Sequence, residues 1–158
     1  MINENNNLKI NLIDYDANCN IPSSYKLKKW ARFAYLQKQK NSVNIKVATK
    51  MEMRNLGKRY LKRKNVCNAL SFQNTSIPRE NKLGEIIVCA DVINEESSKY
   101  KISLDKRWCH MIIHSMLHLQ GFNHKAKDAK LKMERKEILL MKKLGFSNPY
   151  LIWIAKKI

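Results

Sequence analysis

The segment LDKRWCHMIIHSMLHLQGFNH, residues 104–124, is the part of the sequence on which the predicted fold is built. Apolar residues recur at helical spacing from Leu104 to Gln120, which predicts a strongly apolar helix. Gly121 follows directly, and a glycine at this place predicts a left-handed residue that ends the helix. A helix with so little polar surface has to be covered by other elements, so we expect it at the centre of the molecule.

The remaining elements are predicted from periodicity on both sides of this helix. Alternating or continuous apolar runs predict strands at 8–14, 43–49, 68–72 and 83–90, the last covered on both faces. Helical spacing predicts helices at about 22–40, 50–63 and 127–144, with a short helix and a loop within 91–103. Strands and helices interleave without a repeat or a long linker. The prediction is therefore one α+β domain over residues 1–158, with a mixed, mostly four-stranded sheet.

Length and composition agree with a globular protein. The chain has 158 residues, of which 44% are hydrophobic, so one domain with a sizeable core is expected. The N-terminus is polar and acidic rather than basic and then apolar, and no run of about 18 apolar residues occurs. The sequence therefore predicts a cytoplasmic protein without a membrane span.

The charge is strongly basic, with 31 Lys and Arg against 13 Asp and Glu and a formal net charge of +18. Such a balance favours a polyanionic partner, because basic side chains near a phosphate backbone release condensed counterions. A coding bias is the alternative, since Asn and Ile are also abundant. Charge alone does not identify the nucleic acid.

The cysteines form no CxxC pair and are expected to be reduced thiols: Cys19, Cys67, Cys89 and Cys109. Cys109 lies closest to the histidines. On a helix, however, its direction differs from that of His114 and His118, so we do not expect it to bind a metal.

The four histidines all fall within residues 110–124. His114 and His118 are four residues apart and share one face of the predicted helix. Gly121 allows the chain to turn so that His124 completes a triangle. Three imidazoles around one zinc ion leave a fourth position open, as in catalytic zinc sites. The alternative is that these histidines pack in a core; for His110, packing or supporting a ligand from behind is at least as plausible as a direct role.

The spacing HxxxHxxGxxH also occurs in metzincin proteases, whose pattern is HExxHxxGxxH. In those enzymes the Glu after the first His is the general base. Here Ser115 stands at that position and cannot take a proton at neutral pH. The ligand spacing is kept and the base of peptide hydrolysis is missing, which argues against a protease.

The segment HSMLHLQGFNH (114–124) resembles the HGxLHLxGYDH signature of the YbeY family of metal-dependent bacterial endoribonucleases. The resemblance is colinear over roughly residues 50–150. It includes NALSF (68–72), LGEII (83–87), Tyr60 as the Tyr of an N-x-x-Y-R segment, Lys132 to Glu134, and Gly145 to Tyr150.

The resemblance implies one zinc ion per chain, held by His114, His118 and His124. It further implies cleavage of single-stranded RNA, with roles in maturing the 3′ end of the small-subunit (16S) ribosomal RNA and in ribosome quality control. The implied partners are RNA and the ribosome; DNA is not expected.

Three positions depart from the family pattern. Ser115 replaces a Gly, Asn123 replaces an Asp, and Leu61 stands where the family Arg would follow Tyr60. Asn123 makes the surroundings of His124 neutral rather than anionic. The family Arg looks like a phosphate contact, and we hypothesise that Arg59 or Lys62 replaces it.

The expected chemistry is hydrolysis of a phosphodiester, with the water on the metal at His114 activated because its pKa falls toward about 7. The signature contains no obvious general base; Glu85 or a substrate phosphate is a candidate. Two other classes stay open. One is a zinc hydrolase of another bond, disfavoured by Ser115; the other is a ribosome- or RNA-binding protein with a structural metal.

Overall fold

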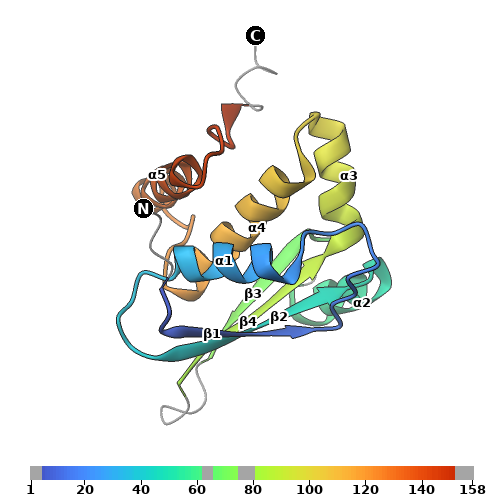
Figure 1. Ribbon diagram of the computed structural model, residues 1–158, viewed down its shortest axis with the longest axis horizontal. Coiled ribbons are helices and arrows are strands. Elements are labelled where there is room, and N and C mark those ends of the chain that lie inside the picture. Colours follow the sequence, from blue (N-terminus) through green and yellow to red (C-terminus); the bar gives the residue numbers. More distant parts are fainter. Residues whose placement is uncertain (1–4, 62–65, 75–80, 152–158) are drawn as a thin grey trace.

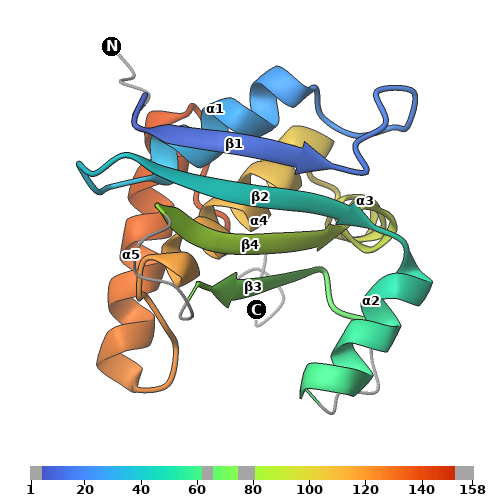
Figure 2. The same cartoon turned by 90° about the horizontal axis from the view of Figure 1, so that it is seen from below.

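Four strands form one mixed sheet in the computed structural model, which describes residues 5–61, 66–74 and 81–151 (Figure 1). The order is β1 (Leu8–Ile13), β2 (Asn41–Ala48), β4 (Lys82–Cys89) and β3 (Ala69–Gln73). β1, β2 and β4 are parallel, and β3 pairs antiparallel with β4 at the edge, as the view from below shows (Figure 2). The predicted α+β class with a four-stranded mixed sheet is confirmed.

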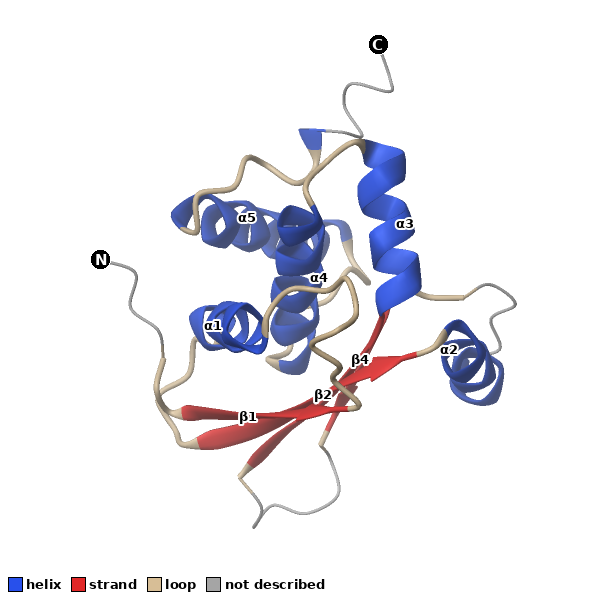
Figure 3. Ribbon diagram, turned by 45° about the vertical axis from the view of Figure 1, so that its right-hand side comes forward, coloured by secondary structure: helices blue, strands red, loops and turns tan. Residues whose placement is uncertain are grey.

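The helices gather mainly on one face of the sheet (Figure 3). They are α1 (Ser24–Ala34), α2 (Lys50–Leu56), α3 (Ala90–Tyr100), α4 (Leu104–Leu119) and α5 (Lys127–Lys143), with a π-helical turn at Gly57–Leu61. α4 contacts α1, α3, α5, β3 and β4. This central position explains why the sequence of α4 is apolar on almost every side, as expected.

The strand β4 is covered on both faces. Ile86 and Val88 point into the main core beneath α1 and α4. Ile87 alternates with them and lies on the opposite face, where it packs with Leu70 of β3 and Met53 of α2. The continuous apolar run in the sequence is thus explained by α2, which covers one end of the second face.

Gly84 is the residue that allows β3, β4 and α4 to approach closely. Its φ is +152°, and a Cβ here would lie 2.2 Å from the carbonyl oxygen of Phe72 and 2.9 Å from Leu119. Any larger residue would push the edge strand away from β4 and α4. The glycine therefore helps to hold β3 beside the C-terminal half of α4.

Three predicted boundaries were wrong in detail. α1 ends at Ala34 rather than near Lys40, because Tyr35 adopts an extended conformation and is buried. The helix predicted over 50–63 is α-helical only to Leu56 and then widens into the π-helical turn; 62 and 63 lie outside the described residues. α3 starts at Ala90, directly from β4, and is 11 residues long. No described helix is long and apolar enough to cross a membrane.

Candidate metal centre

The C-terminal end of α4 turns the chain back toward its own histidines. Gly121 has φ +97°, its N–H donates to the carbonyl of His118 at 3.1 Å, and the Phe122 N–H donates to that of Leu117 at 3.1 Å. This pair of bonds is a Schellman motif, which satisfies the last carbonyls of a helix. The left-handed cap predicted at Gly121 is confirmed. The reversal brings His124 next to the rings on the helix.

The imidazoles of His114, His118 and His124 converge, as the spacing predicted. Ring centroids lie 4.6 Å apart for His114 and His118, 4.5 Å for His118 and His124, and 5.1 Å for His114 and His124. One ring nitrogen from each lies within 4.8 Å of the others. The Nε2 atoms of His114 and His118 are 3.0 Å apart. Two nitrogens bound to one tetrahedral zinc at about 2.0–2.1 Å would be roughly 3.3 Å apart, so this spacing suits a single ion.

The protonation of His118 also suits a metal ligand. Its Nδ1 lies 3.0 Å from the carbonyl oxygen of Phe122, which can only accept, so Nδ1 carries the hydrogen and Nε2 offers a lone pair. Burial, together with the neighbouring His114 and His124, lowers the pKa of His118 to about 4. Burial and His114 lower the pKa of His124 as well. Neutral imidazoles at pH 7 are what a divalent ion such as zinc requires.

A cleft of about 880 Å³ opens beside the three rings. Its walls are β3 with the preceding Asn68, the two half-buried histidines of α4, Ser115 and the turn 121–125. Two side chains attach β3 to α4: the Gln73 amide donates to the His118 carbonyl at 3.0 Å, and the Ser71 hydroxyl to that of Ser115 at 3.4 Å. The edge strand therefore forms a fixed wall of the cleft.

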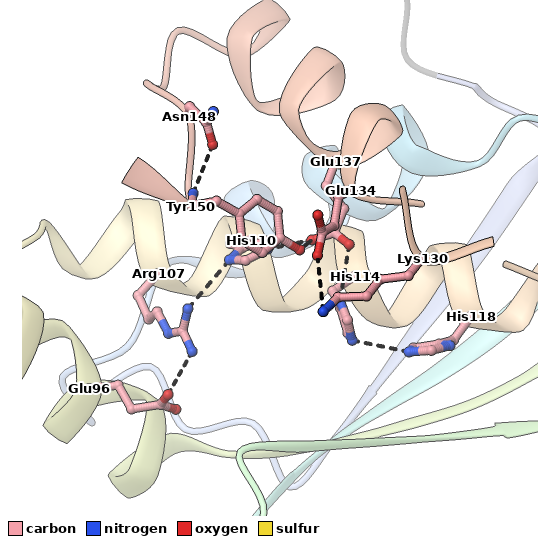
Figure 4. Close-up of polar contacts among 10 residues, drawn as sticks. All are labelled: Glu96, Arg107, His110, His114, His118, Lys130, Glu134, Glu137, Asn148 and Tyr150. Carbon is pink, nitrogen blue, oxygen red and sulfur yellow. Dashed lines mark hydrogen bonds and ion pairs between the residues drawn. The ribbon is translucent and has the colours of Figure 1, made fainter. Parts of the chain in front are cut away.

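A buried carboxylate lies behind His114. Glu137 of α5 is inaccessible to solvent, and its Oε1 is 3.2 Å from Nδ1 of His114. Its Oε2 is hydrogen-bonded to Nε2 of His110 and accepts from the Tyr150 hydroxyl at 2.7 Å (Figure 4). Burial alone would raise the pKa of Glu137, but the hydrogen bonds from His110 and His114 outweigh burial and hold the pKa below its usual range. Burial lowers the pKa of His110.

Two groups of described residues have the donor atoms for a metal ion, and they share His114. The first is His114, His118 and His124, which we name the open group because it faces the cleft. The second is His110, His114 and Glu137, which we name the closed group. Every polar atom that the closed group directs inward is already hydrogen-bonded, and the side chain of Glu137 is 0% exposed. A cation there would have to displace these bonds, so the open group is the better site.

Glu137 was not predicted from the sequence, although its place on the apolar stripe of α5 is a signal for a buried charge. The buried residues of α5 are Met133, Glu137, Leu140 and Met141, at positions i, i+4, i+7 and i+8 of one helical stripe. A charged residue on an apolar stripe requires a buried partner. The position of Glu137 on this stripe therefore predicts an acidic side chain that faces the core. Predicting which histidine it meets requires the packing of α5 on α4.

The other candidate residues lie outside the histidine groups. Arg59 is exposed on the π-helical turn, and Lys62 lies outside the described residues. Glu85 accepts from Lys82 at 3.0 Å, which holds the pKa of its carboxyl below the usual range, and belongs to neither group. Cys109 is fully buried, and burial raises the pKa of its thiol.

Ser115 and Asn123, the two departures within the family signature, have different surroundings in the structure. The Ser115 hydroxyl is buried and has no hydrogen-bond partner among the described residues, so it is no substitute for a general base. The Asn123 side chain accepts from the Lys125 N–H at 3.0 Å and so shapes the turn that carries His124.

The sequence of this chain is similar to known proteins over most of its length. The model of the family described as "Endoribonuclease YbeY" matches residues 4–145. The chain belongs to the YbeY endoribonuclease family. The resemblance found in the sequence motifs covered roughly residues 50–150. The family model also matches most of the first fifty residues.

Curated relatives support the family, and one solved structure shares the fold. An "Endoribonuclease YbeY" of Buchnera aphidicola subsp. Schizaphis graminum is 38% identical, over 83% of this chain and 85% of its own length. The "Endoribonuclease YbeY" of Buchnera aphidicola subsp. Cinara cedri is 40% identical, over 77% of this chain and 80% of its own length. The "Endoribonuclease YbeY" of Wigglesworthia glossinidia brevipalpis is 33% identical, over 82% of this chain and 88% of its own length. A Thermotoga maritima protein determined in solution has the same fold, with a TM-score of 0.50 and 19% identity, over 87% and 91% of the two chains.

Proposed function

We propose that this endoribonuclease is zinc-dependent, cleaves single-stranded RNA and binds one ion per chain through His114, His118 and His124. The observation that carries the proposal is the convergence of three imidazole rings at the mouth of a cleft of about 880 Å³. All three ligands come from one helix and the turn that follows it. One side of the group faces the cleft, which leaves room for water and substrate.

A bound zinc ion would supply Lewis-acid polarisation of a phosphoryl oxygen and activation of water for attack on phosphorus. The chain itself supplies the surroundings. β3 and the turn 121–125 line the cleft in which a single strand of RNA would lie beside the histidines. The hydrogen bonds of Gln73 and Ser71 to α4 fix that wall in place. The pKa values of His118 and His124 are lowered, so at pH 7 each ring has one nitrogen without a hydrogen, which can bind the ion.

Arg59 is proposed as a contact for the RNA backbone. It is exposed on the π-helical turn next to Tyr60, whose ring meets Phe72 edge-to-face at 6.0 Å, and Phe72 lines the cleft. A guanidinium here can bind a phosphate as RNA enters. Arg59→Ala should weaken RNA binding and cleavage, whereas Lys58→Ala, an exposed neighbour on the same turn, should have a smaller effect. Unchanged cleavage in both Arg59→Ala and Lys62→Ala would contradict the proposed phosphate contact.

Tyr60 and Phe72 are proposed to favour unpaired bases. The Tyr60 side chain is 59% exposed and forms an aromatic surface with Phe72 at the cleft. Stacking of one base on an aromatic side chain contributes about 1–3 kcal/mol, and bases are available for it only when unpaired. Tyr60→Ala should weaken binding of a single strand about 5-fold or more, the factor that 1 kcal/mol corresponds to. Tyr25→Ala, at an exposed tyrosine of α1, serves as the control.

The central experiment combines metal analysis with RNA cleavage. Purified protein should contain one zinc per chain, and chelation should abolish cleavage of a single-stranded RNA. Zinc should restore the activity, and His114→Ala should lack it. Cleavage that persists in a chelated sample and in His114→Ala would overturn the proposed mechanism.

Small-subunit ribosomal RNA is the proposed substrate, at the 3′ end of 16S rRNA, with a role in ribosome quality control in the cytoplasm. The family supports an RNA substrate, and the formal net charge of +18 supports a polyanionic partner such as the ribosome. Depletion of the protein should leave 16S rRNA with an extended 3′ end, measured by mapping RNA ends. Two alternatives have distinct outcomes: metal-bound protein that binds RNA without cutting it has a structural metal, and peptide turnover would indicate a hydrolase of another bond.

A further inference from the structure

We infer that Glu137 is a positioning residue that fixes which ring nitrogen of His114 is presented to the metal. The inference rests on the proposed open-group site, and it concerns the buried side of His114 rather than the cleft. Glu137 belongs to α5, whereas His114 belongs to α4, so the contact joins two helices (Figure 4).

The network begins at Arg107, one helical turn before His110. Arg107 is 5% exposed, and its Nη2 donates to the Glu96 carboxylate at 2.6 Å. Its Nη1 lies 3.4 Å from Nδ1 of His110. A guanidinium can only donate, so Nδ1 of His110 is the acceptor. The His110 ring therefore carries its hydrogen on Nε2, directed at Glu137.

Glu137 then receives three donors on two oxygens. His110 Nε2–H and the Tyr150 hydroxyl both donate to Oε2. The position of Tyr150 is itself fixed, because its backbone N–H donates to the Asn148 side chain at 2.8 Å. Oε1 remains for His114, at 3.2 Å from Nδ1. A carboxylate without solvent can only accept here, so it selects the His114 tautomer that carries its hydrogen on Nδ1.

The consequence appears on the other side of the His114 ring. With the hydrogen on Nδ1, the Nε2 atom has a lone pair, and this is the atom 3.0 Å from Nε2 of His118. His118 also presents its Nε2 lone pair, because its Nδ1–H donates to Phe122. Two lone pairs facing each other at this distance repel unless a cation lies between them. Glu137 thus prepares His114 for the metal from behind.

Glu137→Gln provides a sharp test because an amide has only one acceptor oxygen. His110 and Tyr150 together hold that oxygen at the Oε2 position, so the NH2 group faces Nδ1 of His114. His114 should then shift its hydrogen to Nε2 and lose the lone pair that faces His118. Glu134→Gln is the matched control: Glu134 precedes Glu137 on α5 and pairs at 4.0 Å with Lys130, and has no hydrogen bond to a histidine among the described residues.

The first readout is the tautomer of His114 in metal-free protein, from two-bond ¹H–¹⁵N NMR spectra. The wild type and Glu134→Gln should show Nδ1–H, and Glu137→Gln should show Nε2–H. This readout requires neither metal nor RNA, so it is independent of the proposed activity. Nε2–H in the wild type would overturn the inference, even if Glu137→Gln failed to fold.

The second readout is zinc affinity, measured by competition with a chromophoric chelator. Glu137→Gln should bind zinc 10–100-fold more weakly than the wild type, the effect usual for loss of a partner behind a histidine ligand. Glu134→Gln removes a charge that acts on His124 but no hydrogen bond to a histidine among the described residues, so it should lose less zinc affinity than Glu137→Gln. Equal affinity of the wild type and Glu137→Gln would overturn the inference. A wild type that binds zinc without cutting RNA would instead overturn the proposed function and leave this inference standing.

Discussion

His114 lies between the open group and the closed group, and the two differ in solvent access rather than in residue type. The side chain of His114 is 25% exposed, whereas those of His110 and Glu137 are 6% and 0% exposed. In the closed group every inward donor meets an acceptor, so the group holds α5 against α4. In the open group the Nε2 atoms of His114 and His118 face each other at 3.0 Å beside the cleft. The comparison indicates that burial makes the closed group part of the packing between α4 and α5, whereas the open group keeps the access to solvent that the proposed metal site requires.

The largest expected effect separates the groups by metal affinity. His118→Ala removes one of the three proposed ligands, so zinc affinity should fall by more than the 10–100-fold that loss of an outer partner causes. The free energy of unfolding of the metal-free protein should fall less than in a variant of the closed group, because the half-buried His118 ring loses one hydrogen bond, to the Phe122 carbonyl. Zinc titration and urea denaturation in chelator measure the two quantities. A variant that kept wild-type affinity would show that the open group is not the site.

The reverse pattern is expected for the closed group. His110→Ala removes one hydrogen-bond donor from the buried, ionised carboxylate of Glu137. The metal-free protein should therefore lose about 1.5–3 kcal/mol of unfolding free energy. Urea denaturation at pH 7 in chelator measures the loss. If His118→Ala destabilised the metal-free protein as much, the distinction between the groups would fail.

Two glycines sharpen the comparison at a smaller scale. Gly121 and Gly145 end α4 and α5 with the same pair of bonds, at φ +97° and +90°, and a Cβ at either would meet no atom within 4 Å. Replacement by Ala should therefore cost about 1–2 kcal/mol of backbone strain at each. Only Gly121→Ala should also weaken zinc binding, since Gly121 directs the turn that places His124. Equal zinc affinity in both variants would show that the turn does not position this ligand.

The smallest expected effect concerns Tyr150. Tyr150→Phe removes one donor to Glu137 and leaves both histidine contacts. Because the Tyr150 hydrogen bond is only partly buried, whereas that of His110 is buried, unfolding free energy should fall by less than in His110→Ala, by about 0.5–1.5 kcal/mol. Tyr25→Phe, at a tyrosine that is 67% exposed, should change nothing measurable. Thermal or urea unfolding of the two variants tests this. A larger loss in Tyr25→Phe would contradict the assigned role of Tyr150.

Much of the fold could be predicted because its elements carry strong local patterns. β1 and β2 alternate, β4 is continuously apolar, and α4 ends at a glycine that its backbone requires. The errors lie where tertiary contacts override local pattern. Burial of Tyr35 ends α1 early, and the π-helical turn after Leu56 has no marked sequence signal.

The sequence by itself determined the three imidazoles and the turn that unites them, because helical periodicity and a left-handed glycine are local properties of the chain. The sequence also showed that Ser115 stands where a metzincin protease has its general base. Only the tertiary structure decided that Glu137 lies behind His114 and that β3 walls the cleft. Those contacts join residues 23 or more positions apart, and their existence depends on how α5 and the sheet edge pack on α4.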